Sequence, residues 1–110
     1  MAIYKKLDVQ GDVHPTLWKC FGYIAREIAK NGFHDIFITS IREGTHALTS
    51  FHYIGRAIDF KKGKITKGII RLGIAKFCLK YGISENDFDL IAYNDSRDIF
   101  HLEYDPKNIK

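Results

Sequence analysis

The chain has 110 residues, of which 45% are hydrophobic and 27% are charged, and this composition excludes a disordered chain and a membrane-embedded one. The formal net charge of +4 is mildly basic, so it is compatible with a polyanionic partner without requiring one. We therefore expect one small domain over residues 1–110, long enough to bury a core without disulfides.

The N-terminal residues 1–9 alternate apolar and charged side chains, so they lack the uninterrupted apolar stretch of a secretory signal. Farther along, lysines and glycines interrupt every stretch that approaches the roughly 18 apolar residues of a membrane span. We therefore expect a chain that is cytoplasmic when synthesised and is not inserted into a membrane. We also expect it to be a monomer. Cys20 and Cys78 lie in apolar stretches and are expected to be core thiols, with a buried disulfide or a metal role as alternatives.

A helix is expected first, because Pro15 suits the first helical position and apolar residues recur at helical spacing as far as Gly32. Residues 35–41 are β-branched and aromatic and predict a strand. The polar residues 42–50 predict a loop, and residues 56–60 predict a second strand.

The second half of the chain predicts a helix and a hairpin. Residues 66–81 contain an apolar helical stripe and end at Gly82, although Gly68 and Gly73 are unfavourable inside a helix. Short strands near residues 89–94 and 100–104 are expected on either side of a turn. Because strands and helices do not alternate regularly, the order predicts an α+β domain with a central antiparallel sheet flanked by helices.

Two polar segments contain candidate metal ligands. Residues 50–59 read Ser-Phe-His-Tyr-Ile-Gly-Arg-Ala-Ile-Asp, and residues 98–103 read Asp-Ile-Phe-His-Leu-Glu. They supply the imidazoles of His52 and His101 and the carboxylate of Asp59. Catalytic zinc commonly takes three protein ligands of these types and keeps a fourth position open. A sheet that pairs the two strands would bring such a set together, and this pairing is a hypothesis.

The two segments resemble the zinc family of D-alanyl-D-alanine carboxypeptidases, D-Ala-D-Ala dipeptidases and phage L-alanyl-D-glutamate endopeptidases, which share the hedgehog/DD-peptidase fold. The first segment matches the family pattern Ser-x-His-x-x-Gly-x-Ala-x-Asp at every specified position. The second resembles the Asp-x-x-His-aromatic-Glu pattern of the phage branch, except that Leu102 replaces the aromatic residue. The resemblance spans residues 38–103.

The resemblance implies that His52, Asp59 and His101 bind Zn²⁺, that Asp98 is the general base, and that Arg42 stabilises the oxyanion. Positions three apart on a regular strand face opposite sides of a sheet. Asp98 and His101 can therefore converge only if Asp98 lies in the turn before the strand.

By the same resemblance, the expected activity is hydrolysis of a peptide bond in the stem peptide of bacterial peptidoglycan, as in a phage or prophage lysis enzyme. Without a secretory signal, such an enzyme would need a holin or another route to reach the cell wall. A D,D-carboxypeptidase or dipeptidase of this family is the alternative enzyme. A non-catalytic module that binds zinc or nucleic acid is the alternative outside enzymes. No nucleic acid partner is expected, because the aromatic residues alternate with apolar neighbours rather than with lysines.

Several polar residues keep two interpretations. Glu103 either orients a ligand or forms a cross-strand ion pair. His46 either touches substrate or is an exposed loop residue. His14 and His34 flank the first helix and are expected to be structural, and the lysines within residues 61–67 predict a solvated turn or a contact with a wall polymer.

Overall fold

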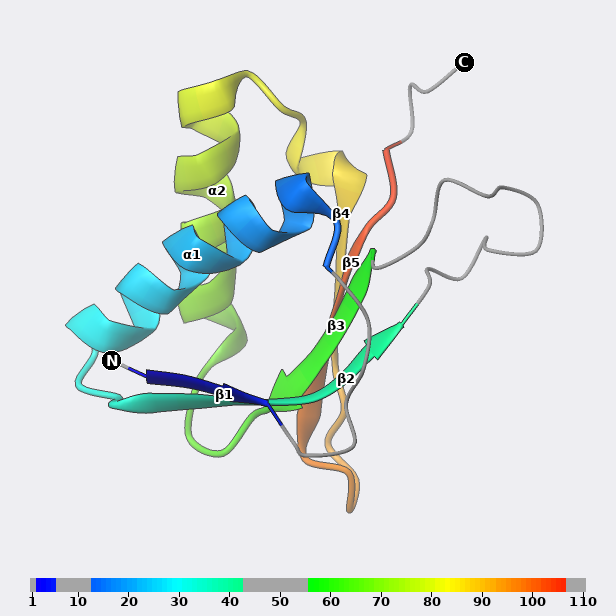
Figure 1. The fold of residues 1–110 in the computed structure, drawn as a ribbon. Coiled ribbons are helices and arrows are strands. Elements are labelled where there is room, and N and C mark those ends of the chain that lie inside the picture. The colour runs from blue at the N-terminus through cyan, green and yellow to red at the C-terminus, as the bar shows by residue number, and fades with distance from the viewer. Residues whose placement is uncertain (1, 6–12, 43–55, 107–110) are drawn as a thin grey trace.

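The computed structural model describes residues 2–5, 13–42 and 56–106, and both predicted helices and all four predicted strands are present. The five strands of this part of the chain form one sheet in the order β1-β2-β3-β5-β4, and both α-helices lie on the same face of it (Figure 1). The α+β class is therefore confirmed. In chain order the elements are β1 (Ala2–Lys5), α1 (Pro15–Lys30), β2 (Asp35–Arg42), β3 (Ala57–Lys61), α2 (Lys67–Tyr81), the short 3₁₀ helix η3 (Glu85–Asp87), β4 (Phe88–Ala92) and β5 (Ile99–Tyr104).

Local capping explains where the two long helices begin and end. α1 starts at Pro15, and Nδ1 of His14 accepts a hydrogen bond from the Thr16 amide at 3.2 Å, which confirms a structural role for His14. α2 is capped at its start by the Thr66 hydroxyl and ends at Gly82, whose φ of 66° is left-handed. None of the described helices has the length and apolar character needed to cross a bilayer.

The sheet differs from the prediction at its N-terminal edge. Strands β2, β3, β5 and β4 pair antiparallel as expected, but β1 pairs parallel to β2. Parallel neighbours need a long crossover, and α1 provides it between β1 and β2. The alternating residues 1–9 indicate an extended segment, but they carry no information about its distant partner.

The core fills the space between the helices and one face of the sheet. The rings of Phe21 on α1 and Phe60 on β3 lie 5.2 Å apart between centroids, nearly perpendicular to each other. Because side chains alternate along a strand, the neighbours of the core residues point to the face without helices. This alternation places Asp59 and His101 on that opposite face. The largest fully buried side chains of the sheet belong to Ile36, Ile38, Ile58, Phe60, Phe100 and Leu102.

Both cysteines are free thiols buried in this core, as expected. Burial raises the pKa of the Cys20 thiol, and it raises the pKa of the Cys78 thiol to about 11. Neither thiol is therefore a reactive thiolate at neutral pH.

A buried acid on α1 links the two helices. Glu27 is 3% exposed, and its carboxylate binds Nζ of Lys76 on α2 at 2.8 Å and Nζ of Lys30 at 3.3 Å. The hydrogen bond from Lys76, helped by Lys30, holds the pKa of Glu27 below its ordinary value. The charged form of Glu27 therefore stabilises the folded state.

We expect Glu27→Gln to lower the free energy of unfolding at pH 7 by about 1–2 kcal/mol, because a charge-assisted hydrogen bond is weakened. The depressed pKa contributes stability above the unfolded value of about 4.3. That contribution is lost as the pH falls through the lower folded value, so the difference between variant and wild type should shrink in acid. Urea denaturation of variant and wild type at pH 7 and at an acidic pH measures this difference in the free energy of unfolding. Glu85→Gln is the control, because Glu85 is exposed. An equally large loss of unfolding free energy in that variant would contradict a specific role for Glu27.

Candidate metal centre

Two of the predicted metal ligands are in direct contact. Asp59 on β3 and His101 on β5 are cross-strand partners, although they are 42 residues apart in sequence. Nδ1 of His101 lies 2.6 Å from Oδ1 of Asp59, and the two residues are 9% and 2% exposed, respectively. The pairing of strands β3 and β5 therefore brings together one nitrogen and one oxygen donor in a sheltered position.

Glu103 holds the other side of the same imidazole. Its Oε1 lies 3.2 Å from Nε2 of His101, so each ring nitrogen faces a carboxylate oxygen. The hydrogen bond with Asp59 is the main reason that the pKa of His101 is raised, and Glu103 adds to the effect against the opposing influence of burial. The pocket around His101 therefore favours a positive charge, either on the ring or beside it.

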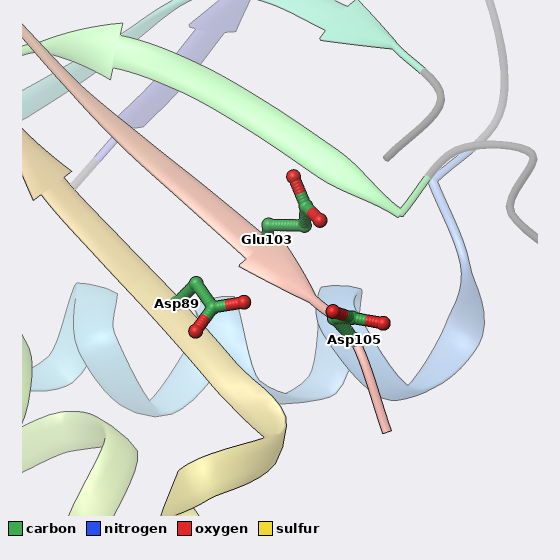
Figure 2. A group of neighbouring side chains, drawn as sticks. All are labelled: Asp89, Glu103 and Asp105. Atoms are coloured by element: carbon green, nitrogen blue, oxygen red, sulfur yellow. The ribbon is translucent and has the colours of Figure 1, made fainter. Parts of the chain in front are cut away.

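More carboxylates gather next to this pair. Figure 2 shows the side chains of Asp89, Glu103 and Asp105, whose oxygen atoms lie within 4.8 Å of one another. Asp89 on β4 is the cross-strand partner of Glu103, and Asp105 follows Glu103 by two positions. Oxygen-only sets of this kind suit hard cations such as Ca²⁺ and Mg²⁺. The mixed pair of Asp59 and His101 has the donor types that zinc takes.

Asp89 and Asp105 lie outside the two polar segments that the sequence singles out. A signal for Asp105 was present, since residues 101, 103 and 105 are all polar and every second residue of a strand shares one face. No comparable signal marks Asp89, because only the register between β4 and β5 brings it beside Glu103.

The segment that carries the predicted oxyanion residue runs beside β3. Ser40 is the register partner of Asp59, and Arg42, the last residue of β2, is the partner of Ala57. The register shifts between Ile38 and Ser40. This irregularity puts Ser40, rather than Thr39, opposite Asp59.

Asp98 lies in the turn before β5, which is the position required for it to approach His101. Its φ of 50° is left-handed, so the chain changes direction there. Its Oδ2 accepts a hydrogen bond from the Gly63 amide at 3.3 Å, and its carbonyl oxygen accepts one from the Lys62 amide at 2.9 Å. The structure thus ties Asp98 to the turn after β3, and these contacts do not include His101.

The outcome differs among the remaining residues that the sequence singles out. His52 and His46 lie outside the described residues. Within the lysine-rich turn, Lys61 and Lys64 are exposed, and Lys62 donates a hydrogen bond to the side chain of Asn94. His34 is exposed before β2.

If His101 is a zinc ligand, Glu103→Gln should weaken zinc binding about 10-fold to 100-fold, because a carboxylate that orients a ligating imidazole strengthens its bond to the metal. Competition with a chromogenic chelator measures the change. Asp89→Asn is the matched control, since it removes one charge from the same acidic group without the contact to His101. Equal losses in the two variants would mean that Glu103 acts only through its charge.

Comparison of the chain with protein family models, with curated proteins and with solved structures finds no match.

Proposed function

We propose that this protein is a zinc-dependent peptidase of bacterial peptidoglycan, built on the hedgehog/DD-peptidase fold and cutting the L-alanyl-D-glutamate bond of the stem peptide. The observation that carries the proposal is the contact between Asp59 and His101. These residues come from separate halves of the two-segment motif, and their donor atoms lie 2.6 Å apart on neighbouring strands. Both helices lie on one face of the sheet (Figure 1). Strand alternation places Asp59 and His101 on the other face, and this arrangement supports the proposed fold.

The donor set fits zinc chemically. An imidazole nitrogen and a carboxylate oxygen already adjoin, the imidazole is oriented by a further carboxylate on Glu103, and the pair is shielded from solvent. In the proposal His52 completes the set. Zinc bound there would acidify a water molecule and polarise the substrate carbonyl.

The other proposed roles belong to residues of the chain. Hydrolysis of an amide needs a proton acceptor for the attacking water and a positive group for the developing oxyanion. We assign the proton acceptor to Asp98 and the oxyanion contact to Arg42. For Asp98, this role requires that its carboxylate exchange the Gly63 amide for the attacking water when substrate binds.

Digestion of purified muropeptides, followed by mass spectrometry, tests the proposed activity. With one zinc per chain, the expected products result from cleavage between alanine and glutamate. Release of terminal D-alanine would instead indicate a carboxypeptidase, and intact stem peptides would refute the proposal. A salt-sensitive gel shift without any action on cell walls would favour a nucleic-acid-binding module.

Asp98→Asn separates catalysis from the structure of the turn. Asparagine tolerates a left-handed φ and keeps an oxygen that can accept from Gly63, so the turn should survive. We expect the variant to keep its zinc and to lose about 100-fold to 10,000-fold in kcat. Full activity with bound zinc would show that Asp98 is not the base.

A further inference from the structure

A pocket of about 360 Å³ opens beside the Asp59 and His101 pair, along the outer edge of the sheet. Arg71 of α2 and residues 88–91 of β4 line it. His101 and Glu103 of β5 contribute from the other face of the sheet. The pocket thus connects the helix layer with the proposed metal ligand.

The edge of β4 in this pocket has unused backbone groups within the described part of the chain. There, β4 pairs with β5 alone. Just beyond the two ends of β4, the Asp105 amide donates to the Asp87 carbonyl and the Tyr93 amide donates to the Ile99 carbonyl. These bonds show that the backbone amides and carbonyls of the odd-numbered residues of β4 point towards β5. Because facing directions alternate in an antiparallel pair, the amide and carbonyl of Leu90 point outward. An extended peptide can pair with such an edge.

Charges are distributed unevenly along the pocket. Arg71 is an exposed cation in the lining, and Asp89 and Glu103 contribute carboxylates to it. A ligand with a carboxylate is attracted to Arg71. A guanidinium binds a carboxylate through two parallel hydrogen bonds, so it would also fix the orientation of that group.

We propose that this pocket is the binding site for an acidic peptide, which pairs with the backbone of Leu90 as an added strand and places a carboxylate against Arg71. The inference rests on the proposed function, because the L-alanyl-D-glutamate unit carries a suitable carboxylate. Arg71 then determines specificity without contacting the bond that is cut. The peptide runs from Arg71 along β4 towards His101.

The test compares two synthetic stem peptides that differ only in whether the glutamate α-carboxylate is free or amidated. For the zinc-loaded wild type, we expect KM to be about 10-fold to 100-fold lower for the free acid, with similar kcat. Arg71→Ala should abolish this preference by raising KM for the acid, and Arg71→Lys should restore part of it. Lys80→Ala is the matched control, since Lys80 is an exposed cation on α2 that does not line the pocket. A preference unchanged in Arg71→Ala would overturn the proposal.

Binding measured by calorimetry keeps the inference separate from the proposed activity. If neither peptide is cut, the proposed function fails, yet tighter binding of the acid that depends on Arg71 would still support the pocket. Equal binding of both peptides to wild type and Arg71→Ala would refute it. The amide resonance of Leu90 should shift on titration with the acid peptide, and an unchanged Leu90 signal would exclude pairing along β4.

Discussion

Under the proposed function, zinc binding and peptidase activity are expected to disappear together when His101 is replaced by alanine. The substitution removes the nitrogen donor that lies 2.6 Å from Asp59, and it also removes the partner of Glu103. Loss of an orienting carboxylate alone costs about 10-fold to 100-fold in metal affinity, so loss of a ligand should exceed that range. Metal analysis after dialysis and a muropeptide digest measure the two quantities.

His34→Ala is the matched control, because His34 is an exposed histidine before β2. It should keep one zinc per chain and full activity. Circular dichroism must show that His101→Ala is folded, since the side chain is buried. A folded His101→Ala protein that still holds one zinc at wild-type affinity would contradict the proposed metal centre.

The largest effect on stability is expected for Gly73→Ala on α2. A Cβ at this position would lie 2.6 Å from Cα and 2.9 Å from the backbone nitrogen of Ile24 on α1. The backbone of Ile24 cannot rotate away as a side chain can, so the two helices must move apart. We expect a loss of about 3 kcal/mol in the free energy of unfolding, at the upper end for an overpacked core. Urea denaturation followed by circular dichroism measures it.

Gly22→Ala on α1 gives the opposite expectation for the same chemical change. A Cβ at Gly22 meets nothing within 4 Å, and alanine is favoured over glycine inside a helix by about 1 kcal/mol. This variant should be more stable than wild type. If the two substitutions had similar effects, close packing of α1 against α2 would not be the reason for glycine at position 73.

Local signals were enough to predict the helices. Pro15 begins α1, and Thr66 and Gly82 bound α2, because capping depends on residues that are near one another in sequence. Gly73 was unfavourable for the prediction of α2, because helix propensity is also judged from the local sequence. Its role depends on contact with another helix, which helix propensity does not include.

Features that depend on distant pairing were predicted less completely. The partnership of β1 with β2 was missed, because a short alternating strand fits many neighbours. The contact between Asp59 and His101 was predicted only as a hypothesis. The register of β3 and β5 that pairs them is seen only in the sheet. The contact of Asp98 with Gly63 depends on a left-handed backbone angle that the sequence does not specify.

The alternation along β3 and β5 has a consequence for how this chain can change in length. Phe60 and Phe100 pack into the core, whereas the adjoining Asp59 and His101 face the opposite side. One inserted or deleted residue within either strand would exchange these two sets, sending charge inward and aromatic rings outward. Natural variation in length should therefore be confined to the connecting loops.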